Sequence, residues 1–404
     1  VYDMVDMIWV GRISSQAVAG VTIFSTIFWL VSVLNEIIGT SSISMITQSY
    51  GMGDEEKTRK IVEQTLTFKV FMAIIAAILF LIFLKPLLHF FSDDPEVIKA
   101  ALDYGYIRVF FLPIMFASYS VNTALRCLGD ANTPMIIMTI TSVLNIILDP
   151  IFMFDKTPGI NIPGLGMGVF GAALATVIST AIAFLFGFWI LLKGKTKLKI
   201  SIKGLFKLDW EIDKKLLTIG LPAGFEVLTR NLSGVITMKF VSMYGTDTVA
   251  AVGIGTKLMS FAFMPAMGIS IGTSTIVGQC LGADSIKRAK DTARYATFVN
   301  IIIMGAIVTI SMIFPENIMS LFIKDPNVIK IGKSMLQIIC PALLGAAMFM
   351  GYGSVFSASG HKTPFLLSSI ISRWIIQIPL LFLITNVLKL SVIYVWASFI
   401  VSSI

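Results

Sequence analysis

The sequence predicts an all-α membrane protein in which twelve transmembrane helices form two pseudo-symmetric six-helix bundles. The first observation behind this prediction is the composition. Of 404 residues, 56% are apolar and only 13% are charged, whereas soluble domains carry about 25% charged residues because they need a hydrated surface. The mean hydropathy is +0.88. A chain so poor in charge needs a solvent other than water, and we expect the lipid bilayer to supply it.

The second observation is that apolar runs recur along the whole chain. A span needs about 20 apolar residues, and runs of about that length or longer predict eleven spans, near 17–47, 63–85, 105–126, 135–154, 168–192, 216–243, 249–279, 296–314, 334–356, 365–386 and 391–404. A shorter run at 1–10 makes the twelfth. We expect the first and last spans to be truncated in this chain.

The third observation is an internal repeat. The stretch 94–99 recurs at 325–330, with the pair Asp94-Pro95 matched by Asp325-Pro326, and Thr133-Pro134 recurs as Thr363-Pro364. The matched pairs lie about 230 residues apart and in the same order. Six spans in each half make the repeats parallel, related by an axis along the membrane normal, and transporters place their substrate path between such halves.

The repeat and the charge pattern together define the domain organisation. We predict an amino-terminal lobe at 1–192, a basic connector at 193–215 and a carboxy-terminal lobe at 216–404. Basic loops stay on the cytoplasmic side, so both termini should be cytoplasmic and the protein multi-pass in the cell (inner or plasma) membrane. The same rule accounts for the net charge of +8 without a nucleic-acid partner. The connector lysines are Lys193, Lys195, Lys197, Lys199, Lys203, Lys207, Lys214 and Lys215.

Two stretches resemble enzyme motifs but lack the context that those motifs need. The GxGxxG stretch at 166–171 has no preceding strand and opens a lipid span, which favours close helix packing. The GxSxG stretch at 268–272 lies inside a span with no histidine near it, and its glycines also fit a helix-packing spacing. We therefore expect no catalytic residues, no enzyme activity and no cofactor.

Four polar side chains inside predicted spans are candidates for an ion site, because an ionisable residue in a span is expensive and usually marks an ion or substrate path. They are Asp6, Asn145, Asp149 and Thr176. The spacing of Asn145 and Asp149 puts them on one helix face. Their oxygens suit a hard cation, and two desolvated carboxylates could instead hold a proton. The alternative is structural: Asp149 caps the end of its span and Asp6 pairs with Arg12.

Several motifs resemble the multidrug and toxic compound extrusion (MATE) transporters along essentially the whole chain. The likeness implies two six-helix lobes around a V-shaped cavity, and export of cationic or amphipathic organic compounds in exchange for H⁺ or Na⁺. It also implies a coupling-ion role for Asp6, Asn145, Asp149 and Thr176, which would be metal ligands only if the ion is Na⁺. The motifs that carry it are 5–12, 48–53, 125–134, 145–150, 220–222 and 277–283.

The chain departs from that family at Glu226, which follows Pro222 by only four residues, about one turn earlier than the carboxylate of some members. We assign no sodium-ligand role to it. Aligned through the repeat, Asn145 falls opposite Trp374 or Ile375, and Asp149 falls opposite Ile378 or Pro379. The hypothesis is that ion coupling resides in the first lobe alone.

The expected partners are a small organic substrate and the lipid bilayer, and we expect a monomer. The sequence leaves open the substrate, the choice between H⁺ and Na⁺, and one rival function, a lipid-linked oligosaccharide flippase of the same superfamily. A flippase needs a cationic cavity for pyrophosphate. Its candidate residues are Arg126, Arg230, Lys239, Lys257 and Arg373.

Overall fold

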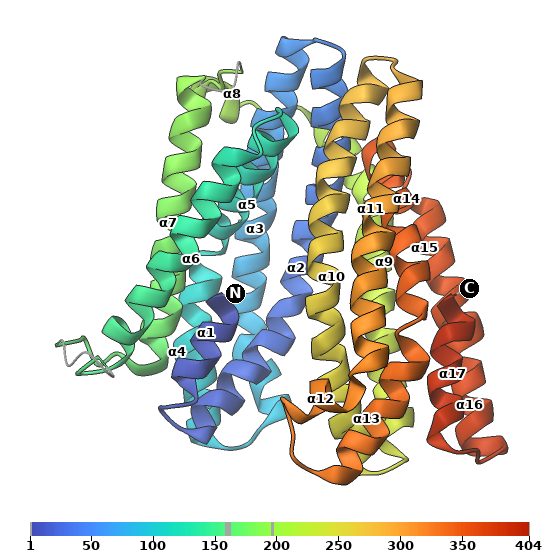
Figure 1. The fold of residues 1–404 in the computed structure, drawn as a ribbon. Helices are drawn as coiled ribbons and strands as arrows, with labels where there is room; N and C mark the ends of the chain where they lie inside the picture. The colour runs from blue at the N-terminus through green and yellow to red at the C-terminus, as the bar shows by residue number, and fades with distance from the viewer. Residues whose placement is uncertain (1, 158–162, 195–197, 404) are drawn as a thin grey trace. The chain divides into compact units, whose positions relative to one another are not determined.

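The computed structural model describes residues 2–157, 163–194 and 198–403, and helices make up most of them (Figure 1). The chain divides into two compact units: 1–50 with 54–217, and 51–53 with 218–404. We call them the amino lobe and the carboxy lobe. Lys195 and Lys197 of the connector lie outside the described residues.

The amino lobe contains long helices and a short connector helix. Two of its helices, α2 and α3, have 37 residues each, well beyond the length that a bilayer requires. The helices are α1 (Tyr2–Val10), α2 (Ser15–Gly51), α3 (Glu55–Phe91), α4 (Pro95–Phe110), α5 (Leu112–Cys127), α6 (Asn132–Met153), α7 (Gly168–Lys193) and the connector helix α8 (Ile202–Leu205).

One span of the amino lobe is bent, and the sequence explains where. Asp94 caps α4 by accepting a hydrogen bond from the backbone N–H of Glu96 at 2.9 Å, with Pro95 in the first turn. This is the arrangement expected of an Asp-Pro pair. The helix ends at Phe110, and α5 continues at an angle of 54° with Pro113 in its first turn. A proline lacks the N–H that would continue the helix, so the bend falls there.

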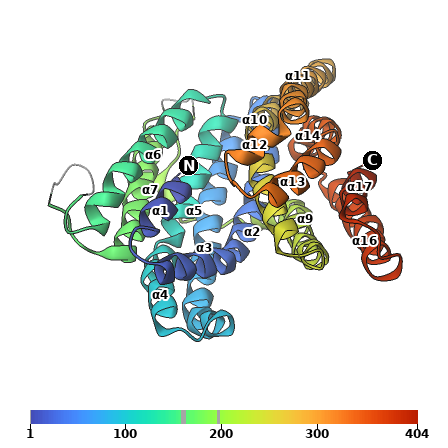
Figure 2. The ribbon, with the colours of Figure 1, turned by 60° about the horizontal axis from the view of Figure 1, so that its bottom comes forward.

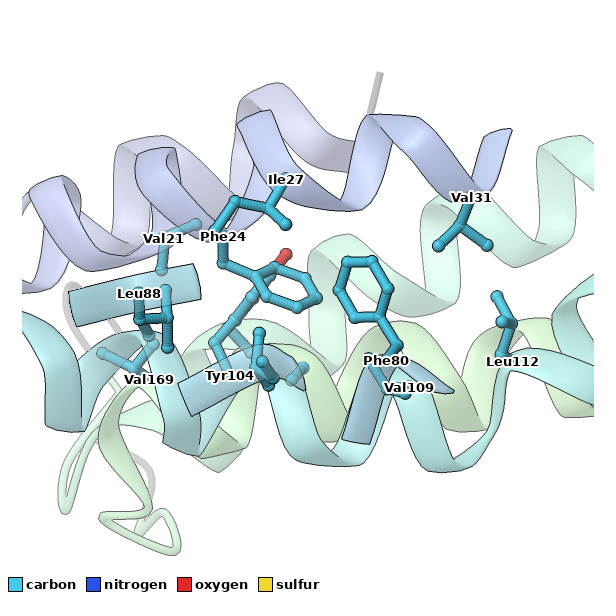
Figure 3. Close-up of a cluster of buried hydrophobic side chains, with 14 of the residues drawn as sticks. Val21, Phe24, Ile27, Val31, Phe80, Leu88, Tyr104, Val109, Leu112 and Val169 are labelled. Atoms are coloured by element: carbon cyan, nitrogen blue, oxygen red, sulfur yellow. The ribbon is translucent and has the colours of Figure 1, made fainter. Parts of the chain in front are cut away.

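The core of the amino lobe is an apolar cluster between α2, α3 and α4 (Figure 3). Phe24 of α2 stacks on Phe28 and meets the ring of Tyr104 edge-on, with centroids 5.2 and 5.6 Å apart. Edge-to-face and offset pairs of this kind are favourable beyond the area they bury. The ring of Tyr104 is therefore held in place by its contact with Phe24.

The carboxy lobe repeats this order of helices. Asp325 caps α13 as Asp94 caps α4, accepting from the N–H of Asn327 at 2.8 Å, and the next helix begins after Pro341. The helices are α9 (Trp210–Ser242), α10 (Thr246–Gly282), α11 (Ile286–Ile313), α12 (Pro315–Ser320), α13 (Pro326–Ile339), α14 (Ala342–Ser359), α15 (Thr363–Ile370), α16 (Ile378–Phe382) and α17 (Val392–Ser403), with π-helical turns η1 (Ile371–Gln377) and η2 (Leu383–Val387) around α16.

The structure confirms the predicted all-α membrane fold. Eight helices of the described residues are long and apolar enough to cross a membrane, and the bent α4–α5 pair makes nine. The three remaining predicted spans correspond to α1, to α9 and to α17. With 9 and 12 residues, α1 and α17 are shorter than a full span, and α9 carries Glu226 and Arg230.

The two glycine motifs behave differently. Gly171 lies on α7 where that helix passes α6, and the two helices run side by side in both views (Figures 1 and 2). A Cβ at Gly171 would lie 2.6 Å from the carbonyl oxygen of Phe152, so close packing is confirmed there. Gly268 and Gly272 face open space instead, and the packing interpretation is wrong for them. Ser270 between them donates a hydrogen bond to the carbonyl of Met350 at 3.1 Å.

Candidate functional site: a buried carboxyl pair in the amino lobe

The four candidate side chains meet inside the amino lobe. Asp6 comes from α1, Asn145 and Asp149 from α6, and Thr176 from α7, and none is more than 2% exposed. The amide of Asn145 donates to Asp149 Oδ1 at 2.9 Å and to Thr176 Oγ1 at 3.3 Å. The Thr176 hydroxyl contacts Asp6 Oδ2 at 3.1 Å. Three helices that are distant in sequence thus place their polar groups in one connected network.

The close approach of α6 and α7 builds half of this network. Asn145 and Asp149 are one helical turn apart, so they point to the same side of α6. Gly171 has no side chain to separate α7 from the backbone of α6, and small residues at such contacts let helices approach closely. The approach carries Thr176, just over one turn beyond Gly171, within reach of Asn145.

The two carboxyl groups also contact each other. Asp149 lies in hydrogen-bonding contact with Asp6, and both are buried. Two ionised carboxylates at that separation repel strongly where no water screens them. A proton shared between the oxygens, or a cation bound to them, would remove this repulsion. The donor set, two carboxyls with an amide and a hydroxyl oxygen, fits either ligand.

The structure adds two residues to the site that the sequence analysis missed, Tyr104 and Arg108 of α4. The hydroxyl of Tyr104 donates to Asp6 Oδ2 at 3.2 Å and accepts from Arg108 Nη1 at 2.6 Å. Arg108 is 7% exposed, and its guanidinium lies 5.5 Å from the ring centroid of Phe28. A permanent positive charge thus lies close to the carboxyl pair, and the Tyr104 hydroxyl contacts both groups. Arg108 could have been identified from the sequence, because it is an ionisable residue inside the predicted span 105–126.

The structural alternative for the two aspartates does not hold. Asp149 lies within α6, and its carboxyl turns toward Asn145 rather than the helix end. Arg12 lies over the ring of Trp9, 4.6 Å from the centroid, while Asp6 contacts Tyr104 and Thr176.

A cavity of about 390 Å³ adjoins the site. Its lining combines apolar side chains with hydroxyl groups and includes the ring of Tyr104, whose hydroxyl contacts Asp6. A space of this size accommodates several water molecules. The lining residues are Met7, Val21, Thr22, Ser25, Thr26 and Tyr104.

A second buried cation of the amino lobe is separate from this network. Lys69 of α3 is fully buried, and its ammonium lies 4.9 Å from the ring centroid of Tyr119 and 5.9 Å from that of Phe116. Glu36 of α2 lies within electrostatic range and accepts a hydrogen bond from Thr40 at 2.8 Å. Two aromatic faces and a nearby carboxylate are the usual way to hold a lysine away from water.

The residues considered for a pyrophosphate site come from both lobes: Arg126 belongs to the amino lobe and the other four belong to the carboxy lobe. Lys239 and Lys257 are exposed. Arg126 donates to the Thr123 hydroxyl at 3.3 Å at the end of α5. In the carboxy lobe Arg230 pairs with Glu226 at 3.3 Å, and Arg373 lies within electrostatic range of both. Among the described residues, no group of three or more His, Cys, Asp or Glu side chains could hold a metal ion.

Comparison with known proteins places the chain. A family model for MatE matches residues 1–151 and 222–383. The chain belongs to the MatE family. The probable multidrug resistance protein YoeA of Bacillus subtilis is 30% identical over 404 residues, covering 98% of this chain and 85% of the relative. The probable multidrug resistance protein NorM of Thermotoga maritima is 27% identical over 403 residues, covering 98% and 84%.

Solved structures agree with the MatE assignment at the level of the fold. A crystal structure of MATE in the bent conformation matches with a TM-score of 0.90 at 23% identity, over 100% of this chain and 87% of the other. A MOP superfamily transporter from Pyrococcus furiosus, described as having a binding pocket of reversed polarity, also matches with a TM-score of 0.90, at 24% identity over 100% and 88%. The resemblance inferred from the motifs is confirmed, and the chain is a multi-pass membrane protein of a transporter family.

Proposed function

We propose that this MatE protein is a secondary active antiporter that exports cationic or amphipathic organic compounds from the cell, driven by one inward-moving monovalent cation. The observation that carries the proposal is the buried Asp6–Asp149 pair in the amino lobe. Such a pair is expensive in a membrane unless it binds the ion that does the work. We infer the substrate class from the relatives, which are named as multidrug resistance or multidrug export proteins.

The charge count supports one ion per cycle. Asp6 and Asp149 bring two negative charges when ionised, and Arg108 brings one permanent positive charge through Tyr104. The cluster then has a net charge of minus one, which a single H⁺ or Na⁺ neutralises. We put H⁺ first, because a proton bridges two carboxyl groups in direct contact without any further ligand.

The mechanism uses the side chains of this chain as follows. A cation reaches the carboxyl pair through the hydroxyl-lined cavity beside Tyr104. Its arrival removes the repulsion between Asp6 and Asp149, so the α1, α6 and α7 contacts tighten. A lobe whose packing differs between the ion-bound and ion-free states binds substrate with different affinity in each state, and that difference is the coupling. Release of the ion on the other side of the membrane resets the pair.

The remaining parts of the proposal follow the membrane character of the chain. The protein acts in the plasma membrane with both termini cytoplasmic, works as a monomer, catalyses no reaction and needs no cofactor beyond the coupling ion. Glu226 stays outside the coupling site. A flippase activity is less well supported, because Arg230 already has Glu226 as its partner and the relatives are named for multidrug resistance or export.

The test is ion-driven export in proteoliposomes. A cationic dye is loaded, and its efflux is followed under a proton gradient alone and under a sodium gradient alone. We expect efflux under one gradient only, and its loss in Asp149→Asn. Efflux that is unchanged in Asp149→Asn would overturn the proposal, and a dye flux that needs no ion gradient would do the same.

A further inference from the structure

A basic cavity lies where the connector packs against the first turns of α3. It has a volume of about 620 Å³ and is lined by α3, the connector and the start of α9, all within the amino lobe unit. By the charge pattern of the loops it faces the cytoplasmic leaflet. Four of its lining side chains are cationic, Arg59, Lys60, Lys203 and Lys207, and three are carboxylates, Glu63, Asp209 and Glu211.

Side chains of α3 hold the connector backbone rigidly around this cavity. The carboxylate of Glu63 accepts a hydrogen bond from the N–H of Ser201 at 2.6 Å, and the hydroxyl of Thr67 donates to the carbonyl of Leu205 at 2.6 Å. The amide of Gln64 bonds to the connector backbone with both its oxygen and its nitrogen. These residues lie on one face of α3, and they fix the positions from which the connector lysines project.

One glycine makes this packing possible. A Cβ added to Gly204 would lie 1.9 Å from the carboxylate of Glu63, so a larger residue there would displace that carboxylate from its hydrogen bond with Ser201. Glu63 is 4% exposed, so the contact is part of a packed interface. The cavity is therefore a built feature of the fold rather than a gap beside a loose loop.

The carboxylates around the cavity already have partners. Glu63 is engaged by Ser201, and Asp209 accepts from the N–H of Glu211 at 3.0 Å at the start of α9. Glu211 itself pairs with Lys215 at 2.7 Å. Because Asp209 caps α9, the amino end of that helix is not open to another anion.

Three of the four cations, in contrast, have no anionic partner in the described part of the chain. Lys60 pairs with Glu56 at 3.1 Å. The Nε of Arg59 is buried and meets no hydrogen-bond acceptor within the described residues. The three cations that remain available to a ligand are Arg59, Lys203 and Lys207.

The same segment exposes large apolar side chains. Phe206 is 86% exposed and Trp210 is 70% exposed. Ile202 and Leu208 are exposed as well, at 58% and 63%. Aromatic side chains are enriched at the boundary between membrane and water, and exposed apolar groups in such a place mark contact with lipid. A ligand that fits both features carries a phosphate and acyl chains together.

We propose that this cavity binds the headgroup of an anionic phospholipid. Arg59, Lys203 and Lys207 surround the phosphate, and Phe206 and Trp210 lie in the interface beside the acyl chains. Guanidinium and ammonium groups are the usual partners of phosphate oxygens, and each basic residue near an anionic leaflet contributes a separate attraction. The site is independent of the ion site and of the transport function.

Native mass spectrometry of the purified full chain in detergent tests this proposal. Phosphatidylglycerol or phosphatidylcholine with the same acyl chains is added, and the bound lipid is counted. We expect one phosphatidylglycerol to be retained in preference to phosphatidylcholine. The triple variant Arg59→Gln, Lys203→Gln, Lys207→Gln should bind it about a hundredfold more weakly, from about fivefold per cation.

The matched control removes three cations elsewhere, with Lys57→Gln, Lys199→Gln and Lys287→Gln, and should retain phosphatidylglycerol. If the triple site variant does not fold, the three single variants should each weaken binding about fivefold. The proposal is overturned if site and control variants bind alike, or if phosphatidylcholine binds as tightly. It is also overturned if millimolar inorganic phosphate displaces the lipid, because the site would then recognise free phosphate.

Discussion

The two lobes differ most at the positions that their repeat makes equivalent. In the amino lobe, α6 is a regular helix that carries Asn145 and Asp149 toward a second carboxyl group. At the matching place in the carboxy lobe, π-helical turns lie on both sides of α16, and Trp374 donates its indole N–H to the carbonyl of Thr229 at 3.2 Å. The two lobes thus share the helix order, but the acidic cluster of α6 has an indole hydrogen bond of Trp374 at its equivalent place.

The two regions also differ in charge: acidic groups predominate in the amino-lobe cluster and basic groups in the carboxy-lobe cluster. The amino lobe gathers two aspartates against one arginine, Arg108. The carboxy lobe gathers two arginines, Arg230 and Arg373, against one glutamate, Glu226. The ion pair of Glu226 with Arg230 is i,i+4 on α9 and partly exposed, so it needs no further ion. Among the described residues, the acidic cluster proposed to bind the coupling cation therefore lies in the amino lobe, and the matching region of the carboxy lobe holds an excess of arginine.

The largest expected effect comes from removing an acidic side chain in the amino lobe and comparing the result with the same change in the carboxy lobe. Asp6→Asn should lower ion-driven dye efflux by about a hundredfold, because a charge-assisted contact in a buried site is worth up to about 3 kcal/mol. Glu226→Gln, the matched change in the other lobe, should leave efflux within about twofold. Efflux in proteoliposomes under the active ion gradient measures both. A larger loss in Glu226→Gln than in Asp6→Asn would reverse the assignment of the coupling lobe.

A smaller effect is expected from the permanent positive charge of the amino lobe. Arg108→Gln should raise the affinity for the coupling cation by roughly tenfold or more, because a positive charge close to the carboxyl pair opposes cation binding. It should also raise the number of cations moved per substrate from one toward two. Ion titration of the purified protein and flux ratios in vesicles measure these quantities. An unchanged stoichiometry would contradict the charge count given above.

The glycines of the two lobes provide a matched pair for stability. Gly171→Ala should destabilise the protein by about 1–3 kcal/mol, because the added methyl group meets the backbone of α6. Gly268→Ala faces open space and should be neutral or stabilising by up to about 1 kcal/mol, through the better helix propensity of alanine. Thermal unfolding in detergent compares them. Equal melting temperatures would contradict the packing described for α6 and α7.

The smallest effect concerns pH and lies outside the spans. Burial, with Asp209 nearby, raises the pKa of the Asp213 carboxyl from 3.8 to about 6. A raised pKa means that the folded state holds the proton more tightly than the unfolded state, so stability falls as pH rises from about 4 through about 6. Asp213→Asn should flatten this part of the stability curve and stabilise the protein at pH 7.5. Melting temperatures from pH 4 to 8 test it against Asp54→Asn as an exposed control.

Much of the molecule could be read from one sequence. The low charge and the apolar runs predict the membrane helices, because lipid tolerates no exposed backbone polar groups and few charges. The caps at Asp94 and Asp325 are local, since the side chain reaches the next N–H groups of the same turn. The candidates Asp6, Asn145, Asp149 and Thr176 were found because an ionisable or polar group is conspicuous in an apolar run.

Contacts between distant segments could not be read in the same way. Tyr104 and Arg108 join the site because α4 packs against α7, which brings Tyr104 within reach of Asp6, and no periodicity in the sequence states which helices are neighbours. The packing role expected of Gly268 failed for the same reason, since a glycine is useful only where another backbone approaches it. The spacing alone did not distinguish it from Gly171.

The sequence by itself predicted that this chain spans the lipid bilayer and that its two halves repeat one arrangement of six helices. It also predicted that the first half carries the two aspartates, Asp6 and Asp149, inside its spans. These properties depend on transfer of each segment from water to lipid and on local caps, which are functions of neighbouring residues. Only the tertiary structure showed that the two aspartates contact each other and that the positive charge of Arg108 lies close to them, with the Tyr104 hydroxyl contacting both. Only the tertiary structure showed the cavity that the connector forms with α3. Those facts depend on distances between helices far apart in the chain, which packing sets.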